Sequence, residues 1–359
     1  MEQLREWRSR IAAELEAVVA FWERHSHDPE HGGFFSCLSR DGSVYDDTKF
    51  VWLQGRQIWV YSRLYRTVPR FRRPELLEAA RKAGEFLQRH VRPEPGSTRA
   101  AFALRRDGRP ERLQRSFYSE AFCALGLDEL GRAAGEPRYR LLGDPKRDPP
   151  SEPDPEAEAM VEWGARHVLM HLQRGDSVVL ENVSPEGEEL PGSLGRLMNP
   201  GHALEAGWLL LELSGRRGDA DLGARAVAGL VEGPLRWGWD PQHGGLFYFL
   251  DADGHCPTQL EWSLKLWWPH AEALVALLAA QRLQPRPELI SRFLHMAQFT
   301  FDKFRDPEHG EWFGYLNRDG SVALSIKGGP YKGCFHVARA LLMCEEMLGD
   351  ILDKEEIKE

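Results

Sequence analysis

The chain has 359 residues, of which 42% are hydrophobic and 28% charged, and its net charge is −9. This composition is typical of a globular protein with one large domain or two average ones. The acidic balance argues against nucleic acid or an anionic membrane as the main partner, because both attract basic surfaces. No apolar run approaches the roughly 18 residues of a membrane span. Five scattered cysteines suggest neither a disulfide framework nor a zinc site, so we expect a reduced, cytoplasmic setting.

The first elements along the chain are a helix, a hairpin and a second helix. Residues 10–22 carry a single apolar stripe, which predicts an amphipathic helix. The stretch DPEHGGFFSCLSRDG at 28–42 combines an Asp-Pro turn with β-prone residues and Asp-Gly, a common hairpin signal. Residues 49–66 are apolar nearly all round, which indicates a helix buried on most sides. An outer helix, a hairpin and an inner helix therefore make one unit.

The same unit recurs along the chain. Close copies of the hairpin stand at 240–254 and 306–320, and weaker copies stand at 101–108 and 178–187. The glycines that end these hairpins are separated by 66, 79, 67 and 66 residues. A constant period identifies an internal repeat. We therefore predict an all-α toroid of helix pairs over residues 1–359, formed as a single domain, with outer helices around an inner ring and the hairpins at one rim.

The long interval contains a segment of unusual composition. Residues 141–158 read LLGDPKRDPPSEPDPEAE, with five prolines in 18 residues. Proline lacks a backbone donor and restricts the residue before it, so this segment is predicted to be an irregular connector.

The repeat brings polar residues into register near the start of the inner helices. Counted from the hairpin glycine, Arg56 lies at +14, His202 at +15, and His270 and His336 both at +16. We therefore predict that these four side chains point toward a common centre. Trp268, in LWWPH, is expected beside them.

Carboxylates and a second arginine accompany these residues on the same helices. Glu205 follows His202 by three residues and Arg339 follows His336 by three, so each pair shares a helix face. Glu272 follows His270 by only two residues and diverges from it.

This set of residues suits removal of a proton next to a carbonyl. Histidine takes or gives a proton near neutral pH, and arginine stabilises a developing oxyanion. Two histidines on opposite faces of a ligand would invert a stereocentre without a cofactor. A metal site built from His202, Glu205, His270 and His336 is an alternative, but the usual ligand spacings are absent. Inverting glycosidases need two catalytic carboxylates, which the register positions do not supply.

Several stretches closely resemble the vertebrate N-acylglucosamine 2-epimerases, among them YDDTKFVWLQGRQIW, LENVSPEGEELPGSLGR, NPGHALEAGW and GGPYKGCFHVAR. The resemblance covers nearly the whole chain. It implies an (α/α)6 barrel, usually dimeric, that interconverts N-acetylglucosamine and N-acetylmannosamine, a step of amino-sugar and sialic acid metabolism. It implies ATP as an activator that is not consumed, and renin as a possible protein partner. No metal is implied. The implied catalytic residues are His202 and His336, and the implied sugar contacts come from Arg56, Glu205, Glu272 and Arg339.

The chain departs from this family in one respect. Six helix pairs are expected, whereas the repeat accounts for five, and the break falls at the proline-rich connector. A glycine-rich segment of the family, which is a candidate for nucleotide contact, is missing with the sixth pair. We therefore expect an opened ring, and we carry a second hypothesis, a non-catalytic shortened form that retains only partner binding.

Overall fold

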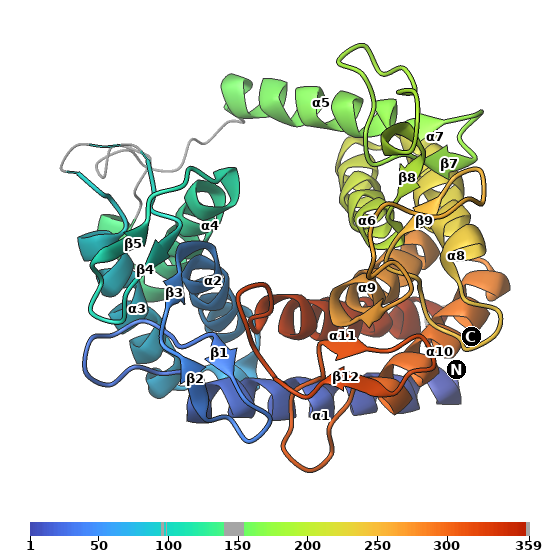
Figure 1. The fold of residues 1–359 in the computed structure, drawn as a ribbon. Coiled ribbons are helices and arrows are strands. Elements are labelled where there is room, and N and C mark those ends of the chain that lie inside the picture. The colour runs from blue at the N-terminus through green and yellow to red at the C-terminus, as the bar shows by residue number, and fades with distance from the viewer. Residues whose placement is uncertain (95–96, 98, 140–153, 357–359) are drawn as a thin grey trace.

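The structure is a computed structural model that describes residues 1–94, 97, 99–139 and 154–356. Its main helices form five outer–inner pairs arranged in a ring (Figure 1). The inner helices are α2 (Val51–Thr67), α4 (Phe117–Ala134), α6 (Pro200–Arg217), α9 (Trp267–Leu283) and α11 (Phe335–Glu356). The outer helices are α1 (Glu2–His25), α3 (Pro74–His90), α5 (Pro155–Met170), the run of α7 (Ala220–Arg225), a π-helical segment (Ala226–Glu232) and α8 (Gly233–Gly238), and α10 (Pro287–Lys303). The predicted all-α toroid with five visible pairs is confirmed.

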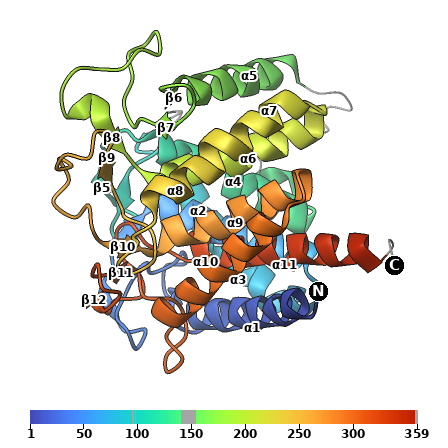
Figure 2. The ribbon, with the colours of Figure 1, turned by 90° about the vertical axis from the view of Figure 1, so that its right-hand side faces the viewer.

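Short antiparallel strands gather at one end of the ring (Figure 2). The five small sheets are β1 (Cys37–Leu38) with β2 (Val44–Asp46), β3 (Lys49–Phe50) with β4 (Ala103–Leu104) and β5 (Pro110–Arg112), β6 (Leu172–Gln173) with β7 (Val178–Val179), β8 (Leu197–Met198) with β9 (Leu250–Asp251), and β10 (Lys265–Leu266) with β11 (Tyr315–Leu316) and β12 (Val322–Leu324). Strands β3, β8 and β10 lead directly into an inner helix, and each pairs with a strand of the next unit. The hairpins therefore hold neighbouring units in register at this rim.

The aspartate of the repeated DPxHG turn links neighbouring units through buried charge. Lys265 Nζ donates to Asp240 Oδ2 at 3.0 Å, and both side chains are fully buried. Arg318, from the following hairpin, donates to the same carboxylate at 2.9 Å. Burial opposes the charge on Asp240, but these hydrogen bonds hold its pKa well below the usual range. The equivalent groups are Asp28, Lys49 and Arg106, and Asp306, Lys327 and Arg40.

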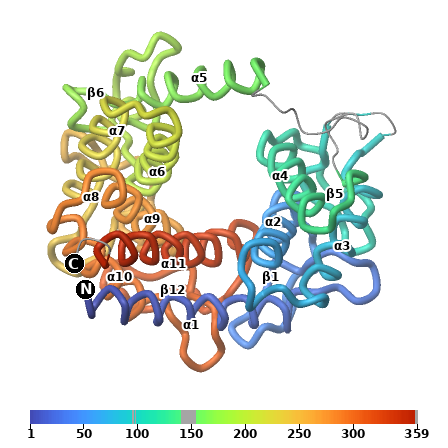
Figure 3. The backbone as a smooth tube through the Cα atoms, turned by 180° about the vertical axis from the view of Figure 1, so that it is seen from behind, coloured from blue at the N-terminus to red at the C-terminus, as the bar shows by residue number. Residues whose placement is uncertain are grey.

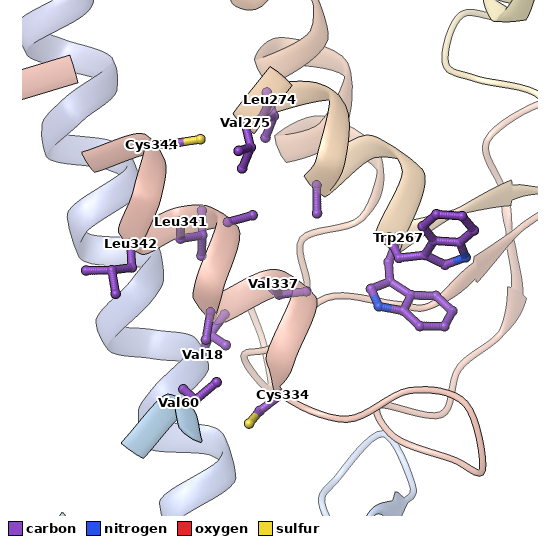
Figure 4. Close-up of a cluster of buried hydrophobic side chains, with 14 of the residues drawn as sticks. Val18, Val60, Trp267, Leu274, Val275, Cys334, Val337, Leu341, Leu342 and Cys344 are labelled. Carbon is purple, nitrogen blue, oxygen red and sulfur yellow. The ribbon is translucent and has the colours of Figure 1, made fainter. Parts of the chain in front are cut away.

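The hydrophobic core lies between the inner and outer helices. Every residue of α9 from Trp267 to Ala280 is buried, as predicted for an inner helix that is apolar on all sides. Figure 4 shows the part of the core where α11 passes between α1 and α9, with Val18, Leu274 and Leu341 among its members. All five cysteines are free, and four of them are buried.

The ring is open between α4 and α6, the inner helices that flank the long interval of the repeat (Figures 1 and 3). Outer helix α5 extends across this opening, and no residue from Pro155 to Met170 is buried. Of the predicted irregular connector, residues 141–153 lie outside the described residues. Residues 155–158 are the first turn of α5, because Asp154 caps that helix by accepting from the Glu156 N–H at 3.0 Å. The prediction of an irregular chain is therefore wrong for these four residues.

None of the described helices combines the length and the hydropathy that crossing a bilayer requires.

Candidate active site

A cavity of about 730 Å³ is lined by residues from all five inner helices and from the loops at the hairpin end of the ring. This volume is within the usual range for small-molecule sites. Five of the eight predicted site residues line it, namely Arg56, His202, Glu205, Trp268 and His336. The other three are His270, Glu272 and Arg339.

His336 lies on the second residue of α11 and is held on both ring nitrogens. Its Nδ1 is 2.7 Å from Glu272 Oε1, and its Nε2 is 3.2 Å from Arg56 Nη1. A guanidinium can only donate, so Nε2 accepts and Nδ1 carries the proton that faces the carboxylate. Burial, together with the charges of Arg56 and Arg339, lowers the pKa of His336 to about 4 although Glu272 opposes the shift. His336 is therefore neutral at physiological pH, with its Nε2 lone pair directed at the cavity side.

Arg56 is clamped among aromatic rings. Its guanidinium carbon lies 4.2 Å from the ring centre of Phe122, 4.7 Å from that of Trp52 and 4.9 Å from that of Phe335. Burial lowers its pKa to about 10, so it stays charged at neutral pH. A fixed cation beside His336 can stabilise negative charge that develops on a ligand oxygen.

His202 lies on the third residue of α6, where the helix start is tightly specified. Pro200 occupies the first turn, and the Asn199 side chain caps the helix by accepting from the His202 N–H at 3.1 Å. Its Nδ1 is 3.0 Å from both carboxylate oxygens of Glu181. Burial lowers the pKa of His202, but the hydrogen bond and charge of Glu181 outweigh it, so the pKa is raised overall.

Trp268 contacts both histidines. Its ring centre is 5.0 Å from that of His202 and 5.9 Å from that of His336. One indole therefore forms a wall of the cavity shared by the two titratable rings, as predicted for this tryptophan.

Glu205 faces the cavity one helical turn after His202. It receives no hydrogen bond from any described residue for which a bond is recorded, and burial together with the charge of Glu272 raises its pKa. Ligand atoms of Glu205, Glu272 and His336 lie within 4.8 Å of one another, a spacing that could hold a metal ion. However, Glu272 already accepts from the guanidinium of Arg339, which supplies positive charge where such an ion would sit.

The structure places the three remaining predicted residues away from the cavity surface. Glu272 is fully buried behind His336 and also accepts from Trp208 Nε1 at 2.7 Å. With Arg339, it orients His336 from the back.

His270 is a correction. Its Nδ1 donates to the Leu266 carbonyl at 2.6 Å, and its Nε2 accepts from the Leu246 N–H at 2.9 Å. Both nitrogens are thus used by the backbone, and its ring stacks on Phe299 of outer helix α10. Burial lowers its pKa to about 3, so His270 is a neutral core residue.

Sequence reasoning missed Glu181. It stands 21 residues before His202, in the stretch after β7, so no helical spacing connects the two. The hairpin that carries Glu181 belongs to the same repeat unit as α6, and this was the only available indication.

The combined geometry suits acid–base chemistry at one carbon atom. Two histidines in one cavity each have a carboxylate at Nδ1, and their electrostatic surroundings differ. His336, next to two arginines, is held neutral, whereas His202, next to Glu181, is biased toward the protonated form. One can accept a proton while the other donates one.

Comparisons with known proteins agree with this chemistry. The sequence matches the profile of the family described as N-acylglucosamine 2-epimerase over residues 33–147 and 179–340. It is 51% identical to N-acylglucosamine 2-epimerase of Bos taurus and 50% identical to that of Homo sapiens, over 98% of this chain and 94% and 92% of those proteins.

Solved structures show the same fold. The structure of cellobiose 2-epimerase from Spirochaeta thermophila superposes with a TM-score of 0.82 at 23% identity, covering 98% of this chain and 99% of that one. The bovine alignment spans 395 positions but includes only 98% of these 359 residues, so about 43 positions have no counterpart here. The family match is interrupted at 148–178, near the opening of the ring.

Proposed function

This chain belongs to the N-acylglucosamine 2-epimerase family, and we propose that it is a sugar 2-epimerase that interconverts N-acetylglucosamine and N-acetylmannosamine. The observation that carries the proposal is the pair His202 and His336, which share one cavity wall and have opposite electrostatic bias. The roughly 50% identity to vertebrate enzymes of that name supports the substrate.

The first step is removal of the C2 proton from the open-chain sugar. Neutral His336 takes this proton at Nε2. The electron pair of the C–H bond forms a C1=C2 double bond, and the carbonyl pair moves onto O1. Arg56, whose Nη1 is 3.2 Å from His336 Nε2, is placed to donate to that oxygen.

The second step returns a proton to C2 from the other face. Protonated His202 gives up its Nε2 proton, the C1=O1 double bond reforms, and the configuration at C2 is inverted. His336 then holds one proton more and His202 one fewer, and exchange with water resets the pair. The reverse reaction uses the same groups in opposite roles. Glu205, with its raised pKa, faces the same cavity and is positioned to hydrogen-bond a sugar hydroxyl.

The direct test is incubation of the purified protein with N-acetylmannosamine, followed by chromatographic detection of N-acetylglucosamine. The expected outcome is an approach to the same product ratio from either sugar. No conversion from either side, with folded protein, would contradict the proposal.

The finer expectations from the family resemblance remain proposals. We propose a cytoplasmic homodimer that acts in amino-sugar and sialic acid metabolism, requires no cofactor and no metal, and takes ATP as an activator. A thermal shift on addition of ATP, measured with and without substrate, tests the nucleotide proposal.

A second candidate function rests on the opening of the ring. Helices α4 and α5 expose large apolar side chains there, including Phe117 and Trp163. A shortened form that binds a protein partner such as renin without catalysis would use such a surface. Binding to renin by a folded protein that lacks turnover would favour this candidate.

A further inference from the structure

We propose that Glu181 is a positioning residue that fixes the tautomer and orientation of His202, so that its Nε2 proton is presented to the cavity. This inference rests on the proposed epimerase function. It begins from a contact that neither the helical spacing nor the family motif indicated.

The contact itself is well defined. His202 Nδ1 is 3.0 Å from each carboxylate oxygen of Glu181, a centred arrangement in which the carboxylate only accepts. Nδ1 must therefore carry a hydrogen, whichever the charge of the ring. In the neutral ring this leaves Nε2 as the acceptor, and in the charged ring Nε2 is a donor. Either form suits a group that exchanges a proton with a ligand at Nε2.

The backbone keeps this contact in place. The Glu181 N–H donates to the Leu197 carbonyl at 2.8 Å. Leu197 is the first residue of β8, which leads through the capping Asn199 into the start of α6. The same short strand therefore fixes both the carboxylate and the helix turn that carries His202.

His202 needs such a partner more than His336 does. The His202 side chain is 53% exposed, so packing alone does not hold its ring. His336 is buried and has contacts on both nitrogens. A carboxylate behind a mobile ring both restricts its rotation and stabilises its cationic form.

Three carboxylates face His202. They are Glu181 from the segment after β7, Glu205 from its own helix and Glu272 from α9. Arg56 of α2 and Arg339 of α11 lie beyond Glu205 and oppose them. Of the three carboxylates, Glu181 is the one with a hydrogen bond to the ring, so its removal changes both tautomer and charge.

The experiment uses full-length protein labelled with ¹⁵N-histidine. Long-range ¹H–¹⁵N spectra of the wild type, assigned with a His202→Ala sample, report the tautomer and the titration midpoint of His202. The expected result is Nδ1–H in the neutral form. A neutral ring protonated on Nε2 would overturn the proposal without any Glu181 variant having to fold.

The variant is Glu181→Gln, with Glu188→Gln, an exposed glutamate of the same hairpin, as the matched control. In Glu181→Gln the His202 midpoint should fall by about one to three pH units, the usual effect of a neighbouring opposite charge. Because catalysis needs protonated His202, activity is lost as pH rises through this midpoint. The alkaline limb of kcat/KM should therefore move to lower pH by the same amount.

The turnover and stability of the variants separate a positioning role from a structural one. We expect kcat to fall by at least about tenfold with little change in KM, because loss of a carboxylate behind an acting histidine typically costs this or more. Glu188→Gln should match the wild type. A lower melting temperature with an unchanged His202 midpoint and pH profile would show a merely structural role. If the midpoint moves as expected but the wild type epimerises no sugar, the proposed function fails and the role of Glu181 stands.

Discussion

The opening between α4 and α6 predicts that restoring the missing helix pair stabilises the protein. Seven large apolar side chains on the helices that border the opening are 42–77% exposed. They are Phe117, Tyr118, Leu125, Met160, Val161, Trp163 and Leu209. In an ordinary closed ring both flanks of an inner helix are covered, so exposure of this kind is the cost of the gap.

The magnitude follows from these exposed fractions. Together the seven side chains expose the equivalent of about four complete side chains. Burying a large apolar side chain is worth about 1.5–3 kcal/mol, so complete covering would recover about 6–12 kcal/mol. Covering half of this surface would add about 3–6 kcal/mol to the free energy of unfolding, which is large beside the roughly 5–15 kcal/mol of a typical domain.

The perturbation is a chimera in which the segment of the bovine relative that has no counterpart here replaces residues 140–153. Thermal unfolding followed by circular dichroism should show a melting temperature higher than that of the native chain by on the order of 10 °C. The chimera should also aggregate less, bind less of a dye for exposed apolar surface, and epimerise N-acetylmannosamine faster, because α4 contributes Tyr118 and Phe122 to the cavity wall.

The matched control carries a Gly/Ser linker of the same length, which fills the gap in sequence but supplies no apolar face. It should melt no higher than the native chain. The reasoning is refuted if the native chain already unfolds in a sharp transition as high as that of the chimera, with equal turnover. That result would mean that five pairs suffice.

Three further predictions concern the chemistry and the rim. In deuterated water the product should carry deuterium at C2, and His202→Ala or His336→Ala should each reduce kcat by about 10²–10⁴-fold; epimerisation without solvent label would instead require hydride transfer. Turnover should survive exhaustive chelation, and loss of activity that is restored by one metal ion would contradict the assignment of positive charge to arginine. Asp240→Asn should lower the free energy of unfolding by about 3–5 kcal/mol, because it leaves Lys265 buried without its counter-ion. Glu356→Gln, which removes an exposed ion pair, should cost no more than about 1 kcal/mol in the same chemical denaturation assay, and equal effects would show that the buried pair has no special weight.

The sequence alone predicted the repeat, the five helix pairs and the level of the polar ring. These depend on local patterns: apolar periodicity, turn residues and a constant interval between hairpin glycines. Arg56, His202 and His336 were found this way, and the structure brings all three to one cavity. The broken interval also indicated where the ring opens.

The direction in which each side chain points was decided by tertiary structure. His270 and His336 both lie 16 residues after a hairpin glycine, but His270 is the fourth residue of α9 and His336 is the second residue of α11. Two residues rotate a side chain by about 200° around a helix, which turns His270 toward outer helix α10. Trp268, the second residue of α9, takes the cavity-facing place instead.

Pairings between distant segments were likewise fixed only by the folded chain. Glu181 meets His202 because β8 holds the Glu181 backbone beside the start of α6, and Arg318 reaches Asp240 across 78 residues because successive hairpins lie side by side at the rim. A sequence pattern records how often a residue type recurs along one segment. It does not record which segments become neighbours, and the contacts that set charge and orientation in this site come from that neighbourhood.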